Sequence, residues 1–193
     1  MSALNSYSAR QKICSGSGRN MLEIGMICAE AGEKIARVSA NMAMAADMEV
    51  RASSTATTGA YSSACQRGLP AILMERGGGG RFTDSEVQAY KQDVKNIMIR
   101  MGLLSGEEVH TVQQKNVTRA EYLEAETDGL WYPVFSAGDT FAGGAVLGTV
   151  RDIWGNLLRE YRADYPGIIL YQTVGLGVKT GDPLIAYGEY VDR

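Results

Sequence analysis

The feature that most constrains the fold is an internal repeat in the C-terminal part of the chain. Gly138–Leu147 and Gly175–Leu184 align at an offset of 37 residues, and both segments place glycine, an aromatic residue or valine, glycine and leucine at matching positions. Glycine at fixed offsets is typical of turns, because it adopts backbone conformations that other residues avoid. The repeat therefore predicts two related hairpins.

Two repeated hairpins of this kind predict a barrel-sandwich built from two interlocking halves. Residues 129–188 should then superpose on themselves under a pseudo-twofold rotation. Gly144 and Gly181 should lie at tight turns or close backbone approaches, and Leu147 and Leu184 should point into one shared core. Because interlocked hairpins exchange strands, the two copies should pair with each other more than within themselves.

The barrel-sandwich is also the shape of biotinyl and lipoyl domains, so a carrier function has to be considered. The connection at residues 151–166 contains no lysine that could be biotinylated or lipoylated. The chemistry of a carrier domain is therefore absent from this repeat.

The composition indicates a globular protein without a nucleic-acid or membrane partner. Of the 193 residues, 45% are hydrophobic and 21% are charged, which is ordinary for a folded protein. The net charge is −3 and the basic residues are scattered, so no surface for a phosphate backbone is expected. Residues 1–19 lack the apolar run of a signal peptide, and no segment approaches a membrane span. A cytoplasmic protein is expected; its oligomeric state, a homo-oligomer included, stays open.

The cysteines and the histidine do not form a metal-binding pattern. Cys14, Cys28 and Cys65 are widely spaced and include no Cys-x-x-Cys pair, which argues against a disulfide framework and a cysteine zinc site. Cys28 lies in an apolar stripe and is expected to be a small buried side chain. The only histidine, His110, cannot form a site that needs two.

The texture of the sequence changes near residue 105, which predicts two domains. Residues 1–105 alternate helical patterns with short apolar runs and are expected to be α/β. Residues 106–193 are rich in glycine, valine and turn signals and are expected to be mostly β.

The order of elements before residue 50 has two interpretations. Met21–Ala31 places apolar residues on one face at helical spacing and is followed by Gly32, which predicts an amphipathic helix ending there. The same spacing could continue further as one long helix. A strand at Lys34–Ala40 is the alternative that we favour.

Two further elements are predicted around a short apolar run. A helix is expected at about Thr58–Gln66, with Gly68 as its C-terminal stop. The uninterrupted run Leu69–Met74 then resembles a strand covered on both faces by helices, and it ends at Glu75.

The clearest helical signal begins at Thr83. Thr83 and Glu86 form the pattern of a capping box, in which each side chain satisfies a free amide of the first turn. Apolar residues then recur at helical spacing until Gly102, and we expect this stripe to lie in the core rather than to hold a cofactor. Its members are Val87, Tyr90, Val94, Ile97, Met98 and Met101.

The segment between that strand and that helix is the candidate site. Glu75 follows the apolar run directly, and four glycines come after Arg76. Ligands of open α/β sheets collect at the carboxyl ends of strands, and glycine lets a substrate approach the backbone. The alternatives are a solvated turn with a flexible connection, or a phosphate loop, although the run lacks the Lys-Ser/Thr ending of a P-loop.

Residues 68–81, Gly-Leu-Pro-Ala-Ile-Leu-Met-Glu-Arg-Gly-Gly-Gly-Gly-Arg, and residues 97–104 resemble the succinylglutamate desuccinylase/aspartoacylase family. The resemblance extends from about Met21 to the C-terminus. It implies the C-terminal part of a zinc-carboxypeptidase-like α/β hydrolytic domain, followed by a small β domain that closes the active-site entrance. It also implies hydrolysis of the amide bond of small acyl-amino acids, with Glu75 as general base and acid beside the metal.

The resemblance suggests further site residues, each with a structural alternative. Arg76 and Arg81 could bind a substrate carboxylate, or they could be surface charges. Tyr61 could contact the substrate, or it could pack in the core. Four aromatic residues of the second domain are expected to pack in the barrel, although one could line the entrance; these are Trp131, Tyr132, Trp154 and Tyr161.

This chain departs from the family in its zinc ligands. The resemblance implies a His-x-x-Glu pair and a later histidine, N-terminal to the matched region, and this sequence contains no His-x-x-Glu. No metal ligand is therefore expected in this chain, and the chain alone is expected to bind zinc no better than roughly micromolar and to show no deacylase activity. It is expected to be either a fragment or truncated reading frame of the deacylase, or a remnant that serves as a non-catalytic binding or assembly module.

Overall fold

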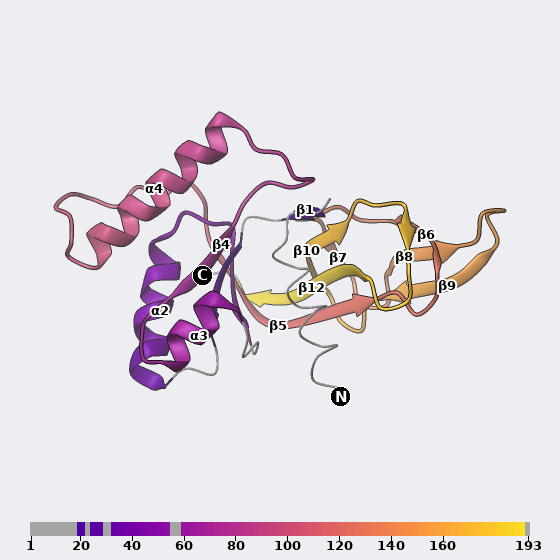
Figure 1. Ribbon diagram of the computed structural model, residues 1–193, viewed down its shortest axis with the longest axis horizontal. Helices are drawn as coiled ribbons and strands as arrows, with labels where there is room; N and C mark the ends of the chain where they lie inside the picture. Colours follow the sequence, from indigo (N-terminus) through magenta and orange to yellow (C-terminus); the bar gives the residue numbers. More distant parts are fainter. Residues whose placement is uncertain (1–18, 22–23, 29–31, 55–58, 192–193) are drawn as a thin grey trace. The chain divides into compact units, whose positions relative to one another are not determined.

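The computed structural model describes residues 19–21, 24–28, 32–54 and 59–191, and these divide into two compact units (Figure 1). The α/β unit contains the described residues of 23–76 and 82–118, together with 191. The β unit contains those of 1–22, together with 77–81 and 119–190. Most of the β unit therefore follows residue 119, whereas the texture of the sequence changes near residue 105.

The α/β unit is a mixed sheet with helices against it. Its elements are β2 (Ile24–Cys28), α2 (Glu33–Ala45), β3 (Val50–Ser54), α3 (Ala60–Gln66), β4 (Ile72–Glu75), α4 (Asp84–Arg100) and the start of β5 (Lys115–Glu124). The strand order is β5-β3-β2-β4, in which β3 is parallel to both neighbours and β4 is antiparallel to β2. Helices α2 and α3 contact β2 and β4, and α4 packs on α2.

The predictions for the first two elements are wrong. Residues 24–28, predicted as part of a helix, form β2, and the favoured strand Lys34–Ala40 lies inside helix α2. Gly32 is the N-cap of α2 and not a C-terminal stop. Short apolar runs satisfy helical and extended spacing equally, and here the parallel pairing of β2 with β3 determines the outcome.

The prediction of helix α3 and of the start of α4 is confirmed. The amide of Glu86 donates to the Thr83 hydroxyl (3.2 Å), and the amide of Thr83 donates to the Glu86 carboxylate (2.5 Å), so both halves of the capping box are present. After α3, Gly68 has a φ of 85°, as expected of a C-terminal stop.

The prediction that the apolar stripe of α4 lies in the core is wrong for three of its members. Val94, Met98 and Met101 are 48%, 37% and 41% exposed. The residues that α4 buries completely are polar, Asp93 and Asn96. Their hydrogen bonds decide which face turns inward, because a buried polar group is stable only where it has partners.

Strand β4 is shorter and less covered than predicted. It begins at Ile72, is half-buried throughout, and lies at the end of the strand order of the α/β unit. The expected strand with both faces covered by helices is therefore wrong, although the run does end at Glu75. Leu69, predicted as its first residue, is 62% exposed.

The β unit contains a four-stranded sheet and the remaining strands of the eight-stranded sheet to which β5-β3-β2-β4 also belongs. Besides the later part of β5, its strands are β1 (Arg19–Met21), β6 (Gly129–Pro133), β7 (Thr140–Phe141), β8 (Val146–Arg151), β9 (Leu157–Arg162), β10 (Gly167–Thr173), β11 (Gly177–Val178) and β12 (Pro183–Val191). One sheet has the order β1-β10-β12-β5 with β7 beside β10, and the other has β11-β6-β8-β9. Over the residues that can be described, neither sheet closes into a barrel.

The positions of the repeat are confirmed in the β unit. Gly144 and Gly181 have φ angles of 79° and 84°, and each lies two residues before its strand, β8 and β12 respectively. Leu147 and Leu184 are fully buried in one cluster that draws residues from both sheets. The two leucines therefore share one core, as the spacing predicted.

The strand pairing shows how the two halves are related. One half consists of β6, β7 and β8, and the other consists of β10, β11 and β12. β7 pairs with β10 of the other half, and β11 pairs with β6 in the equivalent register. Each half therefore contributes its shortest strand to the other. The longer ladders, β6 with β8 and β10 with β12, lie within the halves. The expectation that pairing between the copies exceeds pairing within them is therefore wrong for the long strands.

The aromatic residues of the β unit do not all pack in its core. Trp131 and Tyr161 are buried edge to face, with ring centroids 5.7 Å apart, and a Cβ added at Gly148 would overlap the Trp131 ring. Tyr132 and Trp154 are 44% and 82% exposed, so their predicted packing is wrong. None of the described helices is long and apolar enough to span a membrane.

Candidate active site

Glu75 is the last residue of β4 and lies opposite Ile24 in the ladder with β2. The Tyr90 hydroxyl from α4 accepts a hydrogen bond from the Arg76 amide (2.8 Å) and donates to the Met74 carbonyl (3.3 Å). The backbone is therefore held on both sides of Glu75 by one side chain. This arrangement fixes the end of the strand and the backbone from which the Glu75 side chain extends.

Arg76 is engaged in a buried ion pair. Its guanidinium donates to the Asp93 carboxylate at 2.8 and 3.0 Å, and the two side chains are 3% and 0% exposed. It also donates to the Asp47 carbonyl at 2.8 Å and lies 5.8 Å from the centroid of the Tyr90 ring. These contacts anchor Arg76, the residue that follows Glu75, in the α/β unit. Its predicted role as a substrate ligand stays a prediction.

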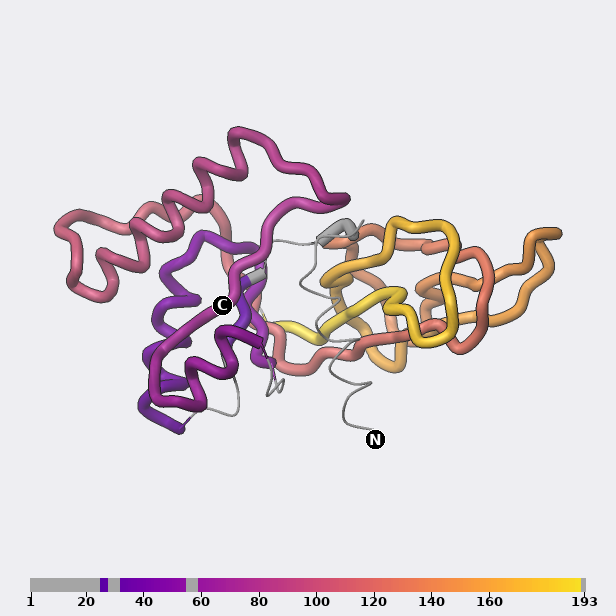
Figure 2. Tube along the Cα trace, viewed as in Figure 1, coloured from indigo at the N-terminus to yellow at the C-terminus, as the bar shows by residue number. Residues whose placement is uncertain are grey.

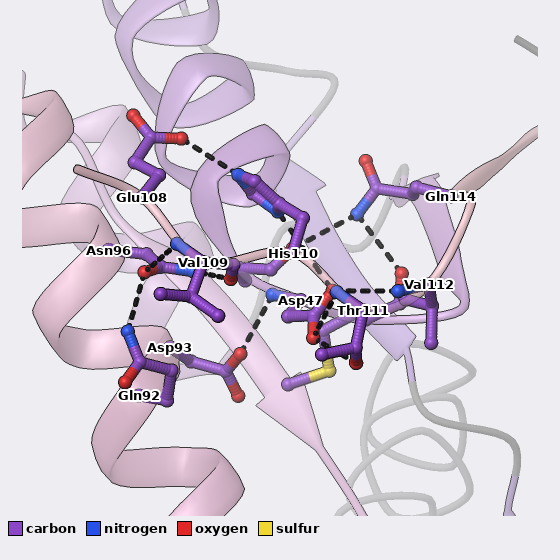
Figure 3. Close-up of polar contacts among 12 residues, drawn as sticks. Asp47, Gln92, Asp93, Asn96, Glu108, Val109, His110, Thr111, Val112 and Gln114 are labelled. Atoms are coloured by element: carbon purple, nitrogen blue, oxygen red, sulfur yellow. Dashed lines mark hydrogen bonds and ion pairs between the residues drawn. The ribbon is translucent and has the colours of Figure 1, made fainter.

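Asp93 and Asp47 connect this anchor to the rest of the α/β unit (Figure 3). One oxygen of the Asp93 carboxylate accepts from the Asp47 amide (2.8 Å), while the other accepts from Arg76. The Asp47 carboxylate in turn accepts from the Thr111 amide (2.8 Å), the Thr111 hydroxyl (2.6 Å) and the Val112 amide (3.1 Å). Hydrogen bonds thus run from β4 through α4 to the segment before β5.

Residues 101–114, which lead from α4 to β5 (Figure 2), are held by polar side chains rather than by an apolar core. The Asn96 side chain exchanges two hydrogen bonds with the Val109 backbone, at 2.7 and 3.0 Å. The side-chain amide of Gln114 donates to the Ala43 and Met48 carbonyls at 3.1 and 3.3 Å. This segment is therefore positioned by side-chain contacts with the backbone.

The single histidine contacts two carboxylates at the surface of the α/β unit. His110 Nε2 lies 2.9 Å from the Glu108 carboxylate, which also binds the Arg100 guanidinium. The Arg100 hydrogen bond is the main reason that the pKa of Glu108 lies below its ordinary value. His110 is 37% exposed and contacts carboxylates, which is typical of a surface charge cluster.

Asp47 is expected to make stability depend on pH. Burial acts to raise its pKa, but the hydrogen bonds from Thr111 and Val112 outweigh burial and hold the pKa below its ordinary value. A depressed pKa contributes stability that is present above the unfolded-state pKa of about 3.9 and is lost as pH falls through the folded-state pKa. Asp47→Asn should therefore destabilise the chain at pH 7, and the deficit should shrink in acid.

Urea unfolding of the wild type and Asp47→Asn at pH 7 and at about pH 3 measures this difference. Glu107→Gln is the matched control, because Glu107 is an exposed carboxylate of the same segment. The control should differ little from the wild type at either pH. An Asp47→Asn deficit that is equal at both values would contradict the proposed linkage.

The other predicted site residues, Tyr61 and Arg81, are not among the residues that contact Arg76 and Tyr90 in the hydrogen bonds described above. Tyr61 is half-buried on α3. Arg81 is exposed, and its amide closes a turn onto the Gly78 carbonyl at 3.1 Å. Gly77, Gly79 and Gly80 all have positive φ, so the glycine run forms a defined turn that other residues would strain. The roles of Arg81 and Tyr61 stay predictions.

The cysteines add no reactive site within the described residues. Cys65 is buried, with its sulfur 3.4 Å from the Ala71 carbonyl and 3.6 Å from the Ser39 hydroxyl. Cys14 and the side chain of Cys28 lie outside the described part, so the prediction that Cys28 is buried is not tested.

The sequence matches no protein-family model, and no curated protein matches it. Several solved structures do share its fold. The product-bound ectoine utilization protein EutE (DoeB) from Ruegeria pomeroyi superposes with a TM-score of 0.79 at 20% identity over 91% of this chain and 56% of that one. A succinylglutamate desuccinylase from Silicibacter sp. TM1040 gives 0.76 at 21% identity over 91% and 56%. A succinylglutamate desuccinylase/aspartoacylase from Rhodobacter sphaeroides gives 0.77 at 21% identity over 92% and 56%.

These similarities establish the fold. Nearly all of this chain is matched, and it spans slightly more than half the length of each of these three structures. The resemblance found in the sequence is thereby confirmed at the level of fold: the chain has the mixed α/β fold, with two sheets, of part of a succinylglutamate desuccinylase/aspartoacylase structure.

Proposed function

We propose that this chain is the C-terminal part of a hydrolase of the succinylglutamate desuccinylase/aspartoacylase family that cleaves the amide bond of N-acyl amino acids. The observation that carries the proposal is Glu75. It is a half-buried carboxylate at the end of a strand, in a fold shared with structures of that family, and its backbone is held on both sides. The β unit would be the small domain of such an enzyme, with the barrel-sandwich arrangement of its two halves.

The chemistry that Glu75 supplies is proton transfer. As a general base its carboxylate takes a proton from the attacking water, and as a general acid it then passes that proton to the leaving amine. Both roles require an oxygen atom held within hydrogen-bond reach of the reacting group. The ladder with β2 and the Tyr90 hydrogen bonds provide a fixed starting point for that side chain.

The residues of this chain do not fit the zinc site that the resemblance implies. Across the described ranges, no group of three or more histidine, cysteine, aspartate or glutamate side chains is placed to hold a metal ion. The sequence has one histidine, and its nearest ionic partners are Glu108 and Asp47. Any zinc in such an enzyme would need ligands from outside the described residues.

A non-catalytic binding or assembly module built on the same fold is the second candidate. One observation favours it: the sequence contains no His-x-x-Glu, the ligand pair expected from the resemblance. In that case Glu75 would be a structural carboxylate, and the fold would persist without hydrolysis.

The experiment that separates the two begins with the coding DNA upstream of Met1. An in-frame segment encoding His-x-x-Glu and a later histidine should be expressed together with this chain and assayed with N-succinyl and N-acetyl amino acids. Release of the free amine by the longer protein, and none by the 193-residue chain, is the expected result. Absence of such a segment, or a longer protein that hydrolyses none of these amides, would favour the module.

A further inference from the structure

The contacts around Glu75 point to a residue whose role the sequence did not suggest. Tyr90 lies on α4 and belongs to the apolar stripe assigned to packing. Its hydroxyl reaches the backbone of β4 on both sides of Glu75, with one hydrogen bond to Met74 and one from Arg76. A phenylalanine would fill the same space, so packing alone does not require this hydroxyl.

We propose that Tyr90 is a positioning residue, whose hydroxyl holds the backbone at Met74 and Arg76 so that the Glu75 carboxylate keeps one orientation. This inference rests on the proposed function of Glu75. A base that is misplaced by about 1 Å loses much of its effect, so a clamp on the two neighbouring residues is a direct way to maintain its geometry.

The surroundings keep this clamp in place. Arg76 lies against the Tyr90 ring and is locked by the buried carboxylate of Asp93, one helical turn further along α4. Tyr90 and Asp93 therefore hold the same strand end from one helix face. Asp47 adds its carbonyl to Arg76 and its amide to Asp93, which closes the arrangement.

The hydroxyl also keeps its proton at neutral pH. Burial is the main cause that raises the pKa of the Tyr90 phenol above its ordinary value, and the nearby Glu75 and Asp93 charges act in the same direction. The hydrogen bond from the Arg76 amide and the positive charge of the Arg76 side chain lower the pKa, but they do not cancel the rise. A protonated phenol can donate to Met74 and accept from Arg76 at once, whereas a phenolate could only accept.

Tyr90→Phe in the 193-residue chain tests the proposal, because it keeps the ring and removes only the hydroxyl. Three-bond NMR couplings about χ1 of Glu75 should change from those of one rotamer to an average of several. Exchange of the Arg76 amide with solvent should accelerate by roughly fivefold, as expected for loss of one hydrogen bond. Unchanged shifts elsewhere in the α/β unit would show that the fold is retained.

The matched control is Tyr132→Phe, since Tyr132 is a 44% exposed tyrosine of strand β6. It should leave the Glu75 couplings unchanged. Glu75 couplings that are the same in Tyr90→Phe and the wild type would overturn the proposal. Because the couplings need no substrate, this result is independent of whether the longer protein hydrolyses amides.

A kinetic measurement extends the test to the active longer protein. Tyr90→Phe should lower kcat while leaving KM nearly unchanged, because the hydroxyl positions a base and binds no substrate. A merely structural role would instead lower the amount of folded enzyme and leave kcat per folded molecule unchanged. Averaged Glu75 couplings together with an unchanged kcat would overturn the catalytic part of the inference.

Discussion

Replacing Asp93 by alanine is expected to lower the free energy of unfolding by about 3–5 kcal/mol. Both side chains of the Arg76–Asp93 pair are almost completely inaccessible to solvent, at 3% and 0% exposure. Alanine would leave the buried guanidinium without this counter-charge and would remove the acceptor of the Asp47 amide. Loss of one partner of a buried pair costs far more than loss of a surface pair, because the remaining charge stays desolvated.

Urea unfolding followed by circular dichroism measures this loss, with Glu160→Ala as the control. Glu160 pairs with Arg162 at 2.8 Å, as Asp93 pairs with Arg76, but those side chains are 36% and 58% exposed. The control should therefore change stability by less than about 1 kcal/mol. The double variant Arg76→Met/Asp93→Ala should be less destabilised than the sum of its single variants. An Asp93→Ala loss as small as that of the control would mean that the pair is solvated.

Two features of the fold, the C-terminal repeat and the start of α4, could be predicted from the sequence. The repeat around Gly144, Gly181, Leu147 and Leu184 was predictable, because turn glycines and core leucines must recur wherever two halves share one core. The start of α4 was predictable because a capping box is a local interaction of Thr83 and Glu86. Both signals depend on residues close in sequence or on an exact spacing.

The elements before residue 50 were not predictable in the same way. Residues 24–28 are extended because they pair with β3, more than twenty positions further along the chain, and no short window of sequence contains that partner. The same holds for the buried face of α4, which is chosen by contacts of Asp93 and Asn96 with Asp47 and Val109. Long-range polar contacts override an apolar periodicity that is only local.

The candidate site was predicted in part for the same reason. Glu75 could be identified because a carboxylate follows an apolar run and precedes glycines, all within a few residues. Tyr90 and Asp93, which bind the residues next to Glu75, come from another element. The sequence pattern predicted packing for Tyr90 and gave no role to Asp93. The sequence does contain a partial signal. Asp93 and Asn96 are polar residues three positions apart, so they lie on one face of a helix that also carries an apolar stripe. Such a face can bury hydrogen-bonding groups.

Glu75→Gln is expected to reduce kcat/KM of the active longer protein by about 10²–10⁴-fold, while leaving the thermal stability nearly unchanged. Glutamine keeps the size and the hydrogen-bonding oxygen of the side chain but cannot take a proton from water at neutral pH. The backbone contacts that fix the position, from Arg76 and Met74 to Tyr90, do not involve the carboxylate and should persist. Rates with N-acyl amino acids and thermal unfolding of the same preparation measure the two effects.

Glu33→Gln, at an exposed position in the first turn of α2, is the control and should change neither quantity appreciably. A large loss of stability with hydrolysis retained would identify Glu75 as a structural carboxylate and would rule it out as the general base.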